Sequence, residues 1–95
     1  MALFNHNGTI CPEGTSLYTL RNRALRYGEG LIETMLWQHQ KVRLFERHSK
    51  RLQDSLATLE FPSFSAEQLR KAIHQVIQAN GEPEKGMLRA QFFRE

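Results

Sequence analysis

The stretch that decides the fold runs from residue 21 to residue 55 and reads RNRALRYGEGLIETMLWQHQKVRLFERHSKRLQDS. Near its start, Gly28 and Gly30 indicate backbone that turns tightly or approaches another group closely. Residues 31–37 (LIETMLW) are apolar on both alternating faces, which is typical of a strand covered on both sides. The single carboxylate of this run, Glu33, therefore needs a partner, because a buried charge is costly unless it is paired.

A hairpin and a helix are predicted in the second half of the stretch. Residues 41–44 (KVRL) are typical of a returning strand, although His39-Gln40 is a poor tight turn. Residues 45–60 are predicted to be helical and to end before Phe61-Pro62, since proline disfavours helical backbone in the residue before it. The apolar face of this helix consists of Phe45, Leu52, Leu56 and Leu59. The polar side chains lie largely off that face: Arg47, Lys50, Gln53 and Asp54.

The N-terminal residues predict a second hairpin. Asn7-Gly8 lies between short apolar pieces within residues 2–10 and supplies the two positive-φ positions of a tight turn. Residues 11–16 (CPEGTS) hold a proline and a glycine and are typical of a loop.

The C-terminal third predicts a second helix with clear ends. Ser65 and Gln68 form a capping-box pattern, in which each side chain bonds the backbone of the other residue. The apolar face consists of Leu69, Ala72, Ile73, Val76 and Ile77. Asn80-Gly81, followed by Pro83, ends this helix.

The order of the elements predicts the fold class. Residues 86–93 (GMLRAQFF) are a last strand, so the chain reads as two hairpins, two helices and a strand. This order predicts a small two-layer α+β domain over residues 1–95, with two helices on one face of a mainly antiparallel sheet. The unpaired edge of the last strand favours dimerisation. It is also typical of a chain cut from a longer protein, so we expect further sequence beyond Glu95.

Composition narrows the class of protein. Ninety-five residues, 40% hydrophobic and 24% charged, are ordinary for one globular domain. The lone cysteine, Cys11, can form no internal disulfide, so we expect a cytoplasmic protein. No apolar run approaches the roughly 20 residues of a membrane span, and we expect no membrane partner. We also predict no metal site, because the four histidines lack ligand spacing: His6, His39, His48 and His74.

The formal net charge of +3 suits either an anionic ligand or a nucleic acid. A basic nucleic-acid binder would use Arg21, Arg23, Arg26, Arg43 and Arg47. The chain lacks the aromatic-interleaved and helix-turn-helix patterns of such proteins, so we expect no nucleic-acid partner.

Two side chains of the first helix could bind an anion. His48 and Arg51 are three residues apart and so lie on nearly the same helical face. An arginine presents a rigid fork of donors that matches phosphate oxygens. The simpler alternative is a solvated basic face that also includes Arg47 and Lys50.

Three other charged residues have similar alternatives. The simpler role for Glu33 is an ion pair with Arg23 or Arg26. Arg89 and Arg94 are five residues apart on the last strand and therefore point to opposite faces, where both could be plain sheet-edge charges.

The order and spacing of these motifs resembles the N-terminal domain of the class IV aminotransferases. These are the fold-type IV pyridoxal-phosphate enzymes, which include branched-chain aminotransferase, D-amino acid aminotransferase and aminodeoxychorismate lyase. The matching segments are Asn22-Arg23, residues 27–34 (YGEGLIET) and residues 48–52 (HSKRL). The resemblance implies pyridoxal phosphate as cofactor, a homodimer, and an amino acid or aminodeoxychorismate as substrate. It also implies that Arg51 binds the cofactor phosphate.

The resemblance further implies a substrate pocket shaped by Tyr27, Ile32, Glu33 and Thr34. Arg94 matches an arginine that holds the substrate carboxylate in the D-amino acid branch, and Arg89 matches one near the pocket in the branched-chain branch. Two positions depart from the family pattern. Asn22 stands where an aspartate is usual, and Ile32 stands where a phenylalanine or tyrosine lines the pocket. The missing ring leaves the class of substrate open.

The same resemblance places the catalytic lysine beyond Glu95. That lysine forms a Schiff base with the cofactor, and none of the four here stands in the corresponding context: Lys41, Lys50, Lys71 and Lys85. We therefore expect the N-terminal part of an aminotransferase or lyase, inactive alone because the C-terminal cofactor and lysine domain is absent. The alternative is a non-catalytic interaction domain that dimerises through its open sheet edge.

Overall fold

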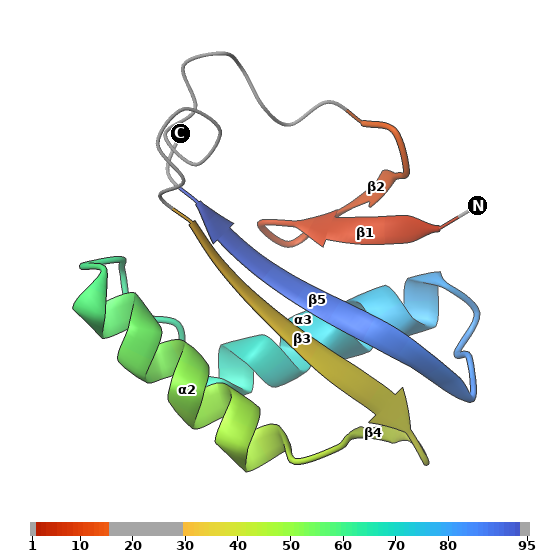
Figure 1. Ribbon diagram of the computed structural model, residues 1–95. Helices are drawn as coiled ribbons and strands as arrows, with labels where there is room; N and C mark the ends of the chain where they lie inside the picture. The colour runs from red at the N-terminus through yellow and green to blue at the C-terminus, as the bar shows by residue number, and fades with distance from the viewer. Residues whose placement is uncertain (1, 16–29, 94–95) are drawn as a thin grey trace.

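The computed structural model describes residues 2–15 and 30–93. Within these residues, β1 (Leu3–His6) and β2 (Thr9–Pro12) form one antiparallel hairpin (Figure 1). A second antiparallel sheet has the strand order β4-β3-β5, built from β3 (Gly30–Gln38), β4 (Lys41–Val42) and β5 (Lys85–Phe93). Two helices, α2 (Phe45–Thr58) and α3 (Ala66–Ala79), connect β4 to β5. The predicted order of elements is confirmed.

The N-terminal hairpin turns where the sequence predicted. Asn7 and Gly8 have φ of 52° and 92°, so both occupy the left-handed region that a two-residue hairpin turn requires. Strand β2 continues through Cys11 to Pro12, and the prediction that a loop begins at residue 11 is therefore wrong. Proline is tolerated here because Pro12 pairs at the very end of the strand.

The second hairpin is confirmed despite its unusual turn. His39 and Gln40 have φ of 56° and 61°, a left-handed conformation that is uncommon for residues other than glycine. The partner strand β4 is only two residues long, pairing Trp37 with Val42 and Gln38 with Lys41. Among the described residues, the short β4 leaves most of β3 paired on one side alone, with β5.

Helix α2 ends earlier than predicted. It stops at Thr58, and Leu59 is the C-cap, followed by Glu60 with φ of 59°. Leu59 is 41% exposed, so its predicted place on the buried face is wrong. The left-handed turn at Glu60 carries the chain away from the helix axis before the proline is reached.

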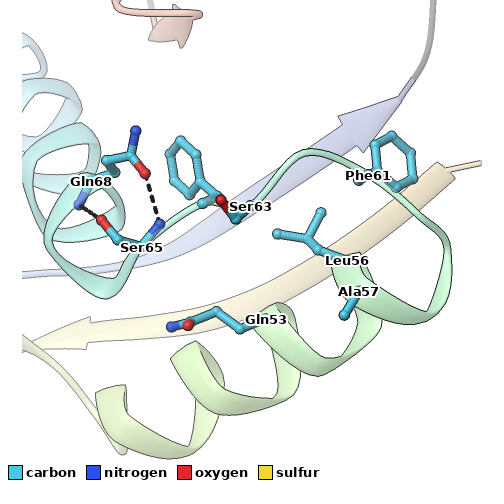
Figure 2. A pocket seen from close by; sticks show the side chains of 8 residues that line it. Gln53, Leu56, Ala57, Phe61, Ser63, Ser65 and Gln68 are labelled. Carbon is cyan, nitrogen blue, oxygen red and sulfur yellow. Dashed lines mark hydrogen bonds between the residues drawn. The ribbon is translucent and has the colours of Figure 1, made fainter.

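Helix α3 begins with the predicted capping box. The backbone N–H of Gln68 donates to the Ser65 hydroxyl at 3.1 Å, and the Ser65 N–H donates to the Gln68 side chain at 2.7 Å (Figure 2). The helix ends at Ala79, and Gly81 follows with φ of 80°, as the Asn80-Gly81 signal predicted. Neither α2 nor α3, the helices of the described residues, is long and apolar enough to cross a membrane.

The core lies between the helices and one face of the three-stranded sheet. Its buried side chains come from β3, β4 and both helices: Met35, Trp37, Val42, Leu52, Leu56, Leu69, Ile73 and Ile77. The domain is therefore the predicted α+β type, with both helices on the same face. The helices and strands of residues 2–15 and 30–93 leave the other face of β3 open, and Ile32 is 55% exposed there. The prediction that residues 31–37 are covered on both sides is wrong for the described structure.

Side-chain hydrogen bonds join the N-terminal hairpin to helix α3 and its C-cap. The Asn80 side chain accepts from the Leu3 N–H and donates to the Leu3 carbonyl, both at 2.8 Å. The Asn5 amide also donates to the Gln75 side chain at 2.9 Å. These contacts join segments at opposite ends of the chain.

Candidate functional site

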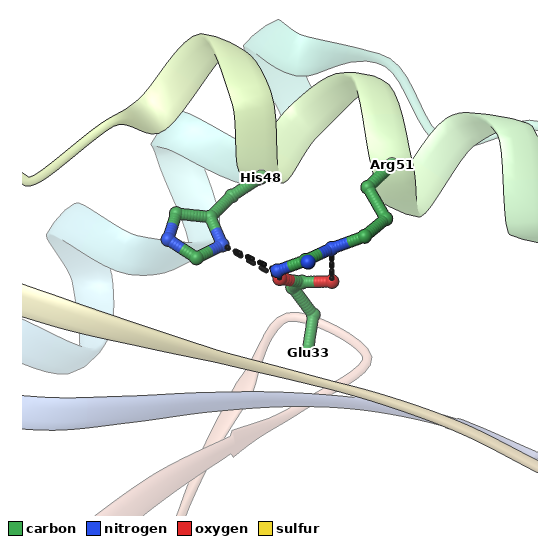
Figure 3. Close-up of polar contacts among 3 residues, drawn as sticks. All are labelled: Glu33, His48 and Arg51. Carbon is green, nitrogen blue, oxygen red and sulfur yellow. Dashed lines mark hydrogen bonds and ion pairs between the residues drawn. The ribbon is translucent and has the colours of Figure 1, made fainter.

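Three side chains meet where α2 crosses β3. The Arg51 guanidinium donates from Nε to Oε1 of Glu33 at 3.0 Å and from Nη2 to Oε2 at 2.5 Å. The His48 Nδ1 lies 2.6 Å from the same Oε2. Figure 3 shows the Glu33 side chain rising from β3 toward the helix, where His48 and Arg51 stand one turn apart. The predicted shared face of His48 and Arg51 is confirmed.

The sequence predicted that Glu33 needs a partner, and the structure confirms this. In the described part of the chain the partners are Arg51 and His48, whereas Arg23 and Arg26 lie outside the described residues. The Glu33–Arg51 pair was not predicted because it joins a strand to a helix across the intervening hairpin, and the alternative pair with Arg23 or Arg26 stays a prediction. Only the tertiary packing of α2 on β3 brings the two residues together.

Electrostatics keeps Glu33 ionised. The Arg51 hydrogen bonds hold the pKa of the Glu33 carboxyl below its usual value, the His48 hydrogen bond adds to this, and burial opposes both. The paired carboxylate raises the pKa of Arg51 in return. An ionised carboxylate can only accept hydrogen bonds, so the Nδ1 of His48 carries the donated proton.

The arginine remains available on its other edge. The Arg51 side chain is 67% exposed, whereas that of Glu33 is 5% exposed. Among the described residues, the close contacts of the guanidinium engage Nε and Nη2. Its Nη1 edge is the one that can present two parallel donors to an oxyanion. The donor chemistry of Arg51 therefore fits a phosphate group.

The other predicted site residues lie on the opposite face of the sheet. Ile32 and Thr34 alternate with Glu33 along β3, so their side chains point away from α2. Arg89 pairs with Thr34 in the register of β5 and shares that open face. The structure thus brings Ile32, Thr34 and Arg89 together and separates them from Glu33. Tyr27 and Arg94 lie outside the described residues.

All four lysines of the chain are exposed: Lys41, Lys50, Lys71 and Lys85. Lys50 forms an ion pair with Asp54 at 3.0 Å on the outer surface of α2. The described residues also contain no cluster of three histidine, cysteine or acidic side chains that could hold a metal ion.

Comparison with known proteins decides the family. The sequence pattern of the family described as amino-transferase class IV matches residues 30–95. The chain belongs to the class IV aminotransferase family. A search of curated proteins found no significant match.

Solved structures agree with this assignment. A hypothetical aminotransferase from Mycobacterium tuberculosis, in its PLP-bound form, is 26% identical with a TM-score of 0.79, over 98% of this chain and 34% of that one. Its form with α-ketoglutarate and PMP is 25% identical with a TM-score of 0.80, over 99% and 35%. A fold IV-transaminase from Curtobacterium pusillum shares the fold at 22% identity and a TM-score of 0.66, over 90% and 29%. The chain spans about a third of the length of these solved structures.

Proposed function

We propose that this chain is the N-terminal small domain of a pyridoxal-phosphate-dependent enzyme, and that Arg51 holds the cofactor phosphate there. The observation that carries the proposal is the arrangement of Arg51, which is fixed by Glu33 on one edge and exposed on the other. The family match includes the whole of this arrangement, since it covers residues 30–95. The PLP-bound and PMP-bound relatives support the choice of cofactor.

Pyridoxal phosphate supplies an electron sink that makes transfer of an amino group possible. This chain contributes binding and orientation. The Arg51 guanidinium matches phosphate oxygens with paired donors and a full positive charge, and Glu33 holds its plane in one direction. The covalent lysine is proposed to lie in another part of the parent protein, because the four lysines of this chain are surface residues. The isolated chain is accordingly proposed to be inactive.

Substrate recognition is proposed for the open face of β3. Ile32, Thr34 and Arg89 lie together there, and Arg89 supplies a cation for a substrate carboxylate. Tyr27 and Arg94 complete the predicted set. The parent is either an aminotransferase of branched-chain or D-amino acid type or an aminodeoxychorismate lyase. We also propose a homodimer through the sheet edge, and a cytoplasmic location in keeping with the lone Cys11.

The test of the phosphate role compares two arginines of one helix. In the intact protein, Arg51→Gln should weaken the affinity for pyridoxal phosphate about tenfold or more, because charge-assisted hydrogen bonds are lost. The affinity for pyridoxal, which lacks the phosphate, should stay within about twofold. Arg47→Gln is the matched control, since Arg47 is an exposed arginine of the same helix. Equal affinities of wild type and Arg51→Gln for pyridoxal phosphate would remove the proposal.

A non-catalytic interaction domain is the second candidate. The open face of the sheet favours it, because Ile32 and Met87 are 55% and 68% exposed there. The intact mass of the natural protein separates the two candidates. A mass well above that of 95 residues, together with binding of pyridoxal phosphate, supports the enzyme. A natural protein of this length that dimerises and binds no cofactor supports the interaction domain.

A further inference from the structure

The Glu33 carboxylate accepts hydrogen bonds from the Nε–Nη2 edge of Arg51, and in the described structure it leaves the Nη1–Nη2 edge available. Its two oxygens take one hydrogen each from Nε and Nη2, at 3.0 and 2.5 Å. A guanidinium is planar and rigid, so fixing the Nε–Nη2 edge also fixes the direction in which the Nη1–Nη2 edge points. The pair therefore sets an orientation as well as neutralising a charge.

The anchor of this pair is the carboxylate. Glu33 lies on β3, which pairs with β5 along its whole length, and its neighbours on the same face include the buried Met35. Arg51 is the exposed member, on a long side chain with many rotamers. The buried Glu33 carboxylate thus restrains the exposed Arg51 guanidinium. Binding residues are commonly oriented in this way by a second residue that does not itself touch the ligand.

His48 restrains the anchor in turn. Its Nδ1 donates to the Oε2 of Glu33 at 2.6 Å, so this oxygen accepts from both helix residues. Nη2 of Arg51 and Nδ1 of His48 are 3.5 Å apart and are both donors toward the shared oxygen. Within residues 2–15 and 30–93, every buried side-chain nitrogen and oxygen has a hydrogen-bond partner. Rotation of Glu33 would break its contacts with both helix residues at once.

We propose that Glu33 is a positioning residue that aims Arg51 at the phosphate, with His48 holding Glu33 in place, rather than a contact of the substrate. This inference rests on the proposed phosphate role of Arg51. It predicts an effect on phosphate binding opposite to the one that charge alone would cause. A carboxylate beside an anion site repels the anion, so removal of its charge alone would strengthen binding. Loss of the orientation weakens binding instead.

The experiment measures the affinity of the intact protein for pyridoxal phosphate in Glu33→Gln. We expect a loss of about threefold to tenfold, since the amide of the new side chain would place a donor against the Nη2 of Arg51. Glu46→Gln is the matched control, because it removes the same charge from the first turn of α2, where Glu46 pairs with Arg70 on the surface. The control should stay within about twofold of wild type.

A double-mutant cycle separates positioning from damage to the fold. In an Arg51→Gln background, Glu33→Gln should cause no further loss of affinity, because the side chain that it orients is gone. A loss that persists in this background, or a gain of affinity in the single variant, would overturn the inference. If Arg51→Gln itself changes nothing, the proposed function fails first, so the two failures are distinguishable.

A second variant and a spectroscopic signal cover the case in which Glu33→Gln does not fold. His48→Ala removes one donor to Glu33 and leaves its charge, and should cause a smaller loss that also vanishes in the Arg51→Gln background. In the protein without cofactor, the Nε proton of Arg51 should exchange slowly with water in wild type and fast in His48→Ala. Unchanged exchange and affinity in His48→Ala would contradict the inference.

Discussion

Both faces of β3 carry apolar residues, but one face is buried and the other is exposed. Odd-numbered positions face the helices, where Met35 is 1% exposed and Glu33 holds Arg51. Even-numbered positions face outward, where Ile32 is 55% exposed although it is as apolar as the core. A single strand therefore joins a stabilising face to a face that the described structure leaves free.

The difference in burial separates residues with a packing role from residues without one. Burial explains the apolar residues of the covered face through the surface that they remove from water. No packing in the described residues explains Ile32, Thr34 and Arg89 on the open face. Residues without a packing role are the better candidates for recognition, whereas Glu33 and Arg51 link the covered face to the proposed phosphate site.

The largest expected effect compares two methionines. Met35→Ala should lower the free energy of unfolding by about 2–5 kcal/mol, because it leaves a cavity in the core. Met87→Ala, on the open face at 68% exposure, should lower it by about 0.5 kcal/mol or less. Urea unfolding of the intact protein measures both. A large loss in Met87→Ala would mean that another part of the parent covers this face.

The next largest expected effect is the pH dependence of stability that Glu33 causes on the covered face. The pKa of Glu33 is lower in the folded protein than its ordinary 4.5, so the unfolded chain takes up the proton first as the pH falls. The stability contributed by Glu33 is complete above this ordinary value and is lost progressively below it. Glu33→Gln should therefore show a shallower decline in stability between about pH 5 and about pH 3.

Unfolding free energies measured across that range give the comparison. Glu46→Gln should decline as steeply as wild type, since the Glu46 carboxylate is exposed and its pair with Arg70 lies on the surface. Parallel curves for wild type and Glu33→Gln would mean that the ion pair adds nothing to folding.

A smaller effect on stability is expected in helix α3, which packs on the covered face of the sheet. Ser65→Ala should cost about 1 kcal/mol, because the first turn of α3 loses its side-chain cap. Gln68→Ala should add little to Ser65→Ala, since the two side chains form one capping box. Thermal unfolding of the two single variants and the double variant measures this. Fully additive losses would contradict a shared motif.

The smallest effect on stability is expected at Ile32. Ile32→Phe restores the ring that the family usually has and should change the unfolding free energy by about 0.5 kcal/mol or less, because the site is open. The KM for the amino substrate of the intact enzyme should change while kcat changes less. An unchanged KM across aliphatic and aromatic substrates would remove Ile32 from the substrate pocket.

Local signals in the sequence predicted most of the fold. The Asn7-Gly8 turn, the capping box at Ser65 and the stop at Asn80-Gly81 each depend on neighbouring residues, so the chain itself specifies them. The face of β3 was not predictable, because residues 31–37 are apolar on both alternating sides. Register with β5 and the packing of α2 decide which side is buried.

The site was predictable in its residue types and not in its connections. Arg51 and His48 followed from helical spacing, and the resemblance suggested a phosphate role that stays a prediction. The Glu33–Arg51 pair depends on a contact between strand and helix that no local pattern records. The exposure of Leu59 was missed for a related reason, since the periodicity continued past the residue where the helix stops.

The pairing of β3 with β5 has a consequence for how the protein is made. Gly30 pairs with Phe93 and Gln38 with Lys85, so both helices lie between the two strands along the chain. On the ribosome, β3 emerges well before β5, because α2 and α3 are synthesised between them. Local helices can form during that interval, but the sheet cannot close until β5 appears. The nascent chain therefore carries an apolar strand without its long partner while α2 and α3 are synthesised, which exposes it to wrong contacts during that interval.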